Sequence, residues 1–139
     1  ALRTRPGPKE PALRHARVCY VHLAGDMGGE LFDALVKARW LVQREGEVTL
    51  SKPGREGFEA LGLDIEALEG ANRPLCRACL DWSVRRNHLA GGLGAGLLQH
   101  VYGQGWARRR NGTRVVEFTS AGERAFRRTF GIEIQRDLR

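Results

Sequence analysis

Apolar residues recur at helical spacing in two separate stretches of the chain. Leu31, Leu35 and Ala38 lie three or four positions apart, a spacing that puts apolar side chains on one face of a helix. The pattern predicts an amphipathic helix over residues 22–39 and a second helix over residues 88–104, each of which ends before a tryptophan.

A short β-hairpin and a closing helix are expected after each of these helices. Asn111-Gly112 is a strong signal for a hairpin turn, and Gly46 occupies the corresponding place in the first hairpin. Ser51 and Thr119 follow the return strands and are suited to begin a helix, because their hydroxyl oxygens can accept a backbone hydrogen bond. The strands expected are residues 41–44 and 48–50 in the first hairpin and residues 107–110 and 114–118 in the second.

The tetrapeptide His-Leu-Ala-Gly occurs at residues 22–25 and again at residues 88–91, an offset of 66. Further matches follow in order, and the offset grows to 68 where a hairpin turn would change length. The matched pairs include Gly28/Gly94, Leu31/Leu97, Trp40/Trp106, Val48/Val116, Gly54/Gly122 and Phe58/Phe126. We therefore expect an α+β, mainly helical fold of two tandem degenerate winged-helix-like repeats, each a helix, a β-hairpin wing and a helix. An unrelated α+β domain with the same local pattern is the alternative.

The expected domain boundaries follow from this repeat. Residues 16–70 form the first winged-helix-like repeat and residues 71–139 form the second. Residues 1–15 include a stretch rich in proline, glycine and charge, which is the composition of a linker. We expect them to connect this chain to an N-terminal domain that it lacks.

Several strings of the sequence resemble the C-terminal region of one subgroup of arsenic-repressor-type (ArsR) transcription regulators. They are ARVCYVHLAG at residues 16–25, RPLCRACLDWSVRRNHLAGGLGAGLL at residues 73–98, and the later GWARRR and FTSAG. The chain departs from the subgroup at Val21, where an acidic residue is usual, and at Cys76, where a cysteine is not typical. Any site that depends on an acid at position 21 is therefore not carried over.

The resemblance implies a function in transcription regulation. In such proteins an N-terminal winged helix binds DNA, so we expect this chain to be the regulatory and dimerisation region of a bacterial repressor that acts as a homodimer. The DNA is then read mainly by the absent N-terminal winged helix. A standalone module that senses a metal or a small ligand is the alternative. The sequence names neither the effector nor the operator.

The positive charge of the chain lies in its second half. Residues 1–69 hold ten Lys and Arg against eleven Asp and Glu, whereas residues 70–139 hold thirteen against five. This asymmetry points to a polyanionic partner, although a genome that favours arginine would also produce it. We expect nonspecific contacts to the backbone of double-stranded DNA from the arginines around the second hairpin turn, which are Arg108, Arg109, Arg110 and Arg114. A solvated basic hairpin is the simpler interpretation.

Five cysteine and histidine residues could form a metal site. Cys19 and His22 would share a helical face, Cys76 and Cys79 form a Cys-x-x-Cys motif, and His88 follows nine residues later. Thiolate and imidazole are the ligands that zinc prefers. We nevertheless favour buried thiols and hydrogen-bonded histidines near the junction of the repeats. We expect no cofactor. If these residues do bind a metal, zinc or another transition metal is the expected ion.

A second candidate site precedes His88. An indole beside guanidinium groups could hold an anionic or aromatic effector, and a salt-bridged connector is the competing interpretation. The residues concerned are Asp81, Trp82, Arg85 and Arg86.

Other functional classes are excluded by what the sequence lacks. It holds no nucleophile with its base, no tight pair of carboxylates and no strand before the glycines of residues 91–96, so we expect no enzyme. No apolar run approaches the length of a membrane span, and three cysteines are an odd number for a disulfide framework. We expect a cytoplasmic protein that does not contact membranes.

Overall fold

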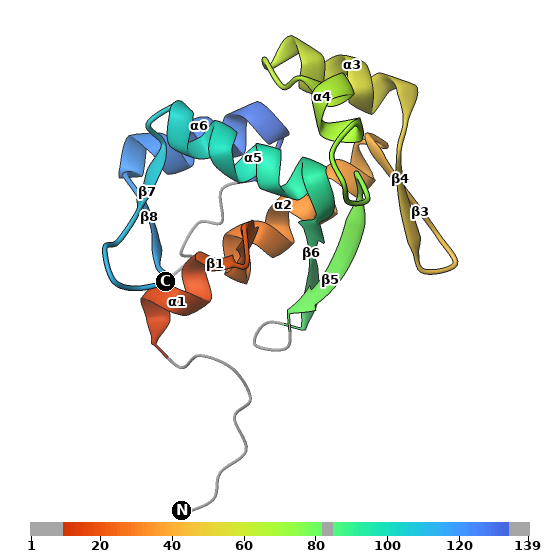
Figure 1. Cartoon of the computed structure of the whole chain (residues 1–139). Helices are drawn as coiled ribbons and strands as arrows, with labels where there is room; N and C mark the ends of the chain where they lie inside the picture. The colour runs from red at the N-terminus through yellow and green to blue at the C-terminus, as the bar shows by residue number, and fades with distance from the viewer. Residues whose placement is uncertain (1–9, 82–84, 134–139) are drawn as a thin grey trace, which may run out of the picture.

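The computed structural model of the chain describes residues 10–81 and 85–133 (Figure 1). The fold is α+β and mainly helical, and in the described part its strands form two-stranded antiparallel hairpins, with one isolated bridge between Arg17 and Val115. The first elements are α1 (Pro11–His15), β1 (Arg17–Cys19), β2 (His22–Ala24), α2 (Gly25–Lys37), β3 (Leu41–Arg44), β4 (Glu47–Leu50), α3 (Lys52–Ala60) and α4 (Ile65–Glu69). They are followed by β5 (Arg77–Asp81), β6 (Arg86–Ala90), α5 (Gly91–Gly103), β7 (Ala107–Arg109), β8 (Val116–Phe118) and α6 (Ser120–Phe130). None of the described helices is long and apolar enough to cross a membrane.

One order of elements occurs twice along the chain. A hairpin, a helix, a second hairpin and a closing helix run from β1 to α3, and the same order runs from β5 to α6. The predicted sequence of helix, wing-like hairpin and closing helix is therefore observed in both halves. Figure 1 shows the two wing-like hairpins, β3–β4 and β7–β8, on opposite sides of the central helices α2 and α5.

The predicted starts of the two central helices are wrong by three residues. His22–Ala24 and Arg86–Ala90 are strands, and the helices begin at Gly25 and Gly91. Both glycines have a φ of +81°, which side chains with a Cβ adopt only at a cost. A Cβ at Gly91 would also lie 2.6 Å from the carbonyl oxygen of Pro74. Each His-Leu-Ala-Gly motif thus marks a break from strand to helix rather than a helical turn. The expectation that no strand precedes the glycines of residues 91–96 is also wrong, because β6 ends at Ala90 and these glycines lie in the first turns of α5.

The predicted closing helices are confirmed together with their caps. The Ser51 hydroxyl accepts a hydrogen bond from the backbone N–H of Gly54 at 3.0 Å, and the Thr119 hydroxyl accepts one from Gly122 at 2.8 Å. The helix that follows each cap carries a phenylalanine that is fully buried. A tryptophan meets each of these rings edge-on, in the pairs Trp40–Phe58 and Trp106–Phe126.

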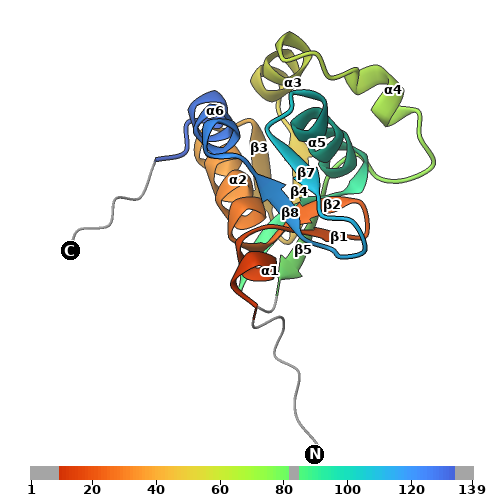
Figure 2. The same cartoon turned by 90° about the vertical axis from the view of Figure 1, so that its left-hand side faces the viewer.

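The two halves interlock at the centre of the molecule. Helix α2 packs on strand β6 of the second half, and helix α5 packs on strand β2 of the first half (Figures 1 and 2). Gly28 makes the first close approach possible, because a Cβ there would lie 3.3 Å from Cβ of His88. Gly94 faces His22 in the same way and at the same distance from its Cδ2. The core is therefore continuous across the expected boundary between the halves.

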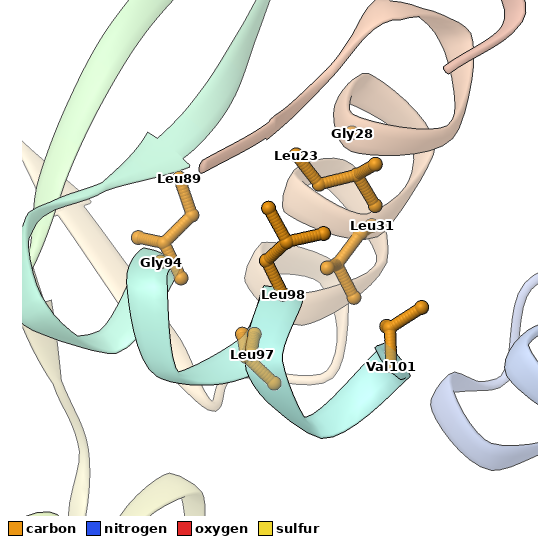
Figure 3. A pocket seen from close by; sticks show the side chains of 8 residues that line it. All are labelled: Leu23, Gly28, Leu31, Leu89, Gly94, Leu97, Leu98 and Val101. Atoms are coloured by element: carbon orange, nitrogen blue, oxygen red, sulfur yellow. The ribbon is translucent and has the colours of Figure 1, made fainter. Parts of the chain in front are cut away.

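An apolar cavity lies between the two central helices (Figure 3). Eight residues from both halves line it: Leu23, Gly28, Leu31, Leu89, Gly94, Leu97, Leu98 and Val101. Its volume is about 10 Å³, which is close to the smallest space that holds one water molecule. This space is a small packing defect between the helices and is too small to hold a ligand.

The second wing-like hairpin is tied to the first half along one edge. The backbone N–H of Val18 in β1 donates to the carbonyl of Arg114, and the N–H of Val116 donates to the carbonyl of Ala16, at 2.8 and 3.0 Å. Residues 11–15, within the stretch expected to be a linker, form α1, which packs on α2. Backbone hydrogen bonds from residues 16–18 therefore fix the β7–β8 hairpin to the first half.

Candidate functional site

The candidate site is the group of cysteine and histidine residues on the two facing hairpins β1–β2 and β5–β6. Cys19 lies directly opposite His22 in the first hairpin, and Cys79 lies directly opposite His88 in the second. Residues opposite each other in an antiparallel pair share one face of the sheet. We call Cys19, His22, Cys79 and His88 the Cys/His cluster.

Three members of the cluster converge on one point. The Sγ atoms of Cys19 and Cys79 and a ring nitrogen of His88 all lie within 4.8 Å of one another. The ring of His22 is next to this group, with its centroid 6.2 Å from that of His88. The structure therefore brings together four of the five predicted residues. It does so through strand pairing, and the prediction that Cys19 and His22 share a helical face is wrong.

His88 is the most deeply buried polar member of the cluster. Its exposed fraction is 1%, and neither ring nitrogen has a hydrogen-bond partner among the described residues. The Nδ1 atom of His22 is also buried without a partner there. Burial lowers the pKa of His88 to about 4, so its imidazole is neutral at pH 7 and carries a free lone pair. The expectation of hydrogen-bonded histidines is therefore not met for these three nitrogens.

The thiols of the cluster are partly buried. Burial raises the pKa of Cys19 above its usual range, and the neighbouring Cys79 raises it further. Burial lowers the pKa of His22, as does the positive charge of Arg73. All four effects favour neutral side chains while no cation is present.

A buried ion pair links the same two hairpins. Arg17 of β1 donates to Asp81 of β5 at 2.7 Å, and both side chains are almost fully buried. The other carboxylate oxygen of Asp81 accepts the backbone N–H of Gly25 at 2.8 Å, at the start of α2. Asp81 thus holds β1, β5 and α2 together, a role that the sequence analysis did not identify.

The second candidate site, around Asp81, is described only in part. Arg86 lies opposite Asp81 in the strand pair but forms an ion pair with Asp33 at 2.8 Å. Arg85 is exposed, with a φ of 53°, and Trp82 lies outside the described residues. Among the described groups of this site, the Asp81 carboxylate therefore pairs with Arg17 and the Arg86 guanidinium pairs with Asp33.

Cys76 lies outside the cluster. It belongs to the segment before β5, where burial raises the pKa of its thiol to about 11. It is not part of the group of converging ligand atoms found in the described part of the chain. The Cys-x-x-Cys motif therefore contributes only its second cysteine to the cluster.

The four predicted DNA-contacting arginines are all exposed on the second wing-like hairpin. Arg108 is 86% exposed at its side chain and lies 3.7 Å from Glu117, and Arg110 forms an ion pair with the same carboxylate at 2.9 Å. Arg109 donates to the carbonyl of Thr113. Glu117, which the sequence analysis overlooked, therefore neutralises part of the charge of this hairpin.

No helix-turn-helix reading head is formed by the described residues. Helices α2 and α5 are each preceded by a strand, and α4 is separated from α5 by the β5–β6 hairpin. Helices α3 and α4 follow each other through a short connection and are in contact, but α4 has only five residues, too few for a recognition helix. A recognition helix would need a second helix packed across it through a short turn. The described part of the chain therefore has wing-like hairpins without that head.

No family model matches the chain. No solved structure matches it either. Among curated proteins, it is 34% identical over 122 residues to a protein of Bacillus subtilis (strain 168) named uncharacterized HTH-type transcriptional regulator YdfF. This chain is similar to a transcription regulator. The match covers 88% of the chain but only 54% of that relative, so the chain spans about half the length of the curated protein it matches.

Proposed function

We propose that this chain is the regulatory and dimerisation region of a bacterial DNA-binding transcription regulator of the ArsR-like type. The similarity to an HTH-type transcriptional regulator over 88% of the chain carries this proposal. In the proposal, DNA is read mainly by a winged helix in another part of the protein. The lack of a reading head among the described residues supports this division, as does the unmatched remainder of the relative.

In this proposal the second wing-like hairpin adds nonspecific affinity for DNA. Its four arginines are exposed and surround a turn, where guanidinium groups can reach phosphates. Glu117 limits this affinity because it pairs with Arg110 and lies near Arg108. The hairpin would therefore strengthen binding at any sequence without selecting one.

The fold is proposed to be two degenerate copies of one winged-helix-like unit. Supporting observations are the repeated order of elements, the equal φ of Gly25 and Gly91, and the equivalent caps at Ser51 and Thr119. The proposed homodimer has separate support, because Tyr20, Val21 and Leu80 are large apolar residues left exposed on the two central hairpins. Sedimentation velocity at several concentrations tests the dimer, and a single monomeric species at all of them would contradict it.

The main test compares the full protein encoded by the gene with this chain alone. We expect the full protein to protect one discrete DNA segment in a footprint of its own promoter region. We expect this chain alone to bind duplex DNA weakly and without sequence preference. Tight binding of one sequence by this chain alone, or no DNA binding by the full protein, would overturn the proposal.

A matched pair of variants tests the role of the wing arginines. Substituting alanine for Arg108, Arg109, Arg110 and Arg114 removes four charges from the hairpin. The control removes four exposed charges elsewhere, at Lys37, Arg44, Lys52 and Arg124. Each lost phosphate contact should reduce the slope of log affinity against log salt by roughly 0.9. An equal loss of slope in both variants would show that net charge, and not the hairpin, accounts for the affinity.

The Cys/His cluster favours a second candidate function, a module that senses a metal or a small ligand without reading DNA. The convergence of two thiols and an imidazole within 4.8 Å is the specific observation behind it. A full protein that binds metal but shifts no DNA fragment would decide for this alternative.

A further inference from the structure

We propose that the Cys/His cluster is a binding site for a single thiophilic divalent cation such as Zn²⁺, with Cys19, Cys79 and His88 as ligands and His22 as the fourth. The ion would connect the β1–β2 hairpin of the first half to the β5–β6 hairpin of the second. This site does not depend on the proposed role in transcription, since metal binding can be measured without DNA.

The spacing of the donor atoms suits a tetrahedral ion. Sulfur atoms that bind zinc at about 2.3 Å in a tetrahedral arrangement lie about 3.8 Å apart. The donor atoms of Cys19, Cys79 and His88 lie within 4.8 Å of one another, so rotations that move each of them by less than about 1 Å would close the shell. Two imidazoles on one such ion would have ring centres about 5 Å apart. The rings of His22 and His88 are 6.2 Å apart, and His22 is not among the residues whose donor atoms lie within 4.8 Å of one another, so its side chain would have to move further than the other three to become the fourth ligand.

The unpaired ring nitrogens are an independent indication of a ligand. A buried polar atom without a hydrogen bond costs free energy, and such atoms are uncommon in folded proteins. Both ring nitrogens of His88 are unpaired beside two thiols, and Nδ1 of His22, whose ring neighbours that of His88, is also buried without a partner among the described residues. A coordinated cation would satisfy one nitrogen of each ring. A purely structural role for the two histidines leaves all three nitrogens without a partner among the described residues, whereas a bound cation leaves one nitrogen of His88.

The charges also balance in the bound state. A zinc ion deprotonates the two thiols and releases two protons, and its two positive charges are cancelled by the two thiolates. The imidazoles bind as neutral groups, which is the form that burial favours. The site is therefore neutral overall, as a partly buried position requires. Cys19 and Cys79 are only partly buried, so an ion can reach them from solvent.

The backbone around the cluster holds the ligands in place. Each cysteine–histidine pair is fixed by the register of its own hairpin. The Arg17–Asp81 ion pair joins the two hairpins beside the cluster. Helices α2 and α5 approach the histidines closely at Gly28 and Gly94. The four ligands are thus supplied by rigid strands rather than by loops, which favours a defined coordination geometry.

The test uses the complete chain, purified without a chelator or a metal-binding tag and kept reduced. After incubation with zinc and removal of the excess, we expect one equivalent of zinc per chain by elemental analysis. Zinc should slow the reaction of two thiols with a titrating reagent, while Cys76, whose burial raises its pKa to about 11, should react equally slowly with and without zinc. Cobalt should replace zinc with an absorption band from thiolate-to-cobalt charge transfer. X-ray absorption should show two sulfur atoms at about 2.3 Å and nitrogen at about 2.0–2.1 Å.

Two serine substitutions separate the cluster from the remaining thiol. Cys79→Ser should lose the stoichiometric metal and the cobalt band, whereas Cys76→Ser, which removes the third cysteine, should keep both. Circular dichroism establishes that each variant is folded, and the absorption measurements on the unaltered chain decide the matter if Cys79→Ser does not fold. Reduced protein that takes up well under one equivalent of zinc would overturn the proposal. Equal metal loss in Cys76→Ser would do so as well, as would an intact mass showing that the two cluster thiols are joined in a disulfide under these conditions.

Discussion

A methyl group added at Gly28 or at Gly94 should destabilise the protein to the same degree. A Cβ at Gly28 would lie 2.3 Å from the carbonyl oxygen of Leu23, and a Cβ at Gly94 would lie 2.3 Å from that of Leu89. These oxygens belong to the strands that lead into the helices, so they cannot rotate away as a side chain would. Each helix would have to move about 1 Å from its strand to restore ordinary contact distances.

The expected magnitude is the difference between two opposing effects. Overpacking of a tight contact costs about 3 kcal/mol at the upper end of its usual range. Replacing glycine with alanine inside a helix raises the free energy of unfolding by about 1 kcal/mol, because alanine has the higher helix propensity. The net loss is about 2 kcal/mol for each variant, which corresponds to a melting temperature lower by roughly 8 °C for a chain of this size.

Thermal unfolding followed by circular dichroism measures this loss, with a chelator present so that no bound metal contributes. Gly103→Ala is the matched control, because Gly103 ends α5 and a Cβ there would meet nothing within 4 Å. We expect this control to unfold at the same temperature as the unaltered chain or slightly above it. Unchanged stability in Gly28→Ala and Gly94→Ala would refute the close approach. A large loss in only one of them would refute the equivalence of the two halves.

Three further predictions concern polar contacts. Asp81→Asn should cost about 3 kcal/mol in urea unfolding, because it leaves the charge of Arg17 buried without its carboxylate. Glu69→Gln, which breaks an exposed ion pair with Arg55, should shift the midpoint by no more than the error of the measurement. Ser51→Ala and Thr119→Ala should each cost about 1 kcal/mol, since each removes one helix cap; a loss in only one of them would mean that the two closing helices are held differently.

The elements with strong local signals could be predicted from the sequence. The wing-like hairpins and the capped helices after them depend on Asn-Gly, Ser and Thr at positions where these residues have a direct backbone effect. The hairpin β1–β2 has no such signal, because its turn consists of Tyr20 and Val21, and Tyr20 adopts a φ of 57°. Without a visible turn, the apolar residues of the His-Leu-Ala-Gly motif were assigned to the following helix.

The sequence predicted which residues form the Cys/His cluster, but it did not predict that paired strands bring them together. The two His-Leu-Ala-Gly motifs led to the expectation that these cysteines and histidines lie near the junction of the repeats, and in the structure they lie on the facing strands β1, β2, β5 and β6. The role of Asp81 could not be found in this way. Its partners, Arg17 and the backbone of Gly25, are more than fifty residues away in sequence. A local sequence pattern cannot predict a contact between residues so far apart.

The exchange of packing partners between the halves makes this chain an intramolecular counterpart of a domain-swapped dimer. Each central helix covers a hairpin that the other half supplies, so neither half contains a complete core of its own. A cut in the exposed segment at residues 70–74 should therefore yield two fragments that fold only in each other's presence. In the intact chain the two halves are connected covalently and must fold together. Unfolding of the chain should therefore appear as one cooperative transition.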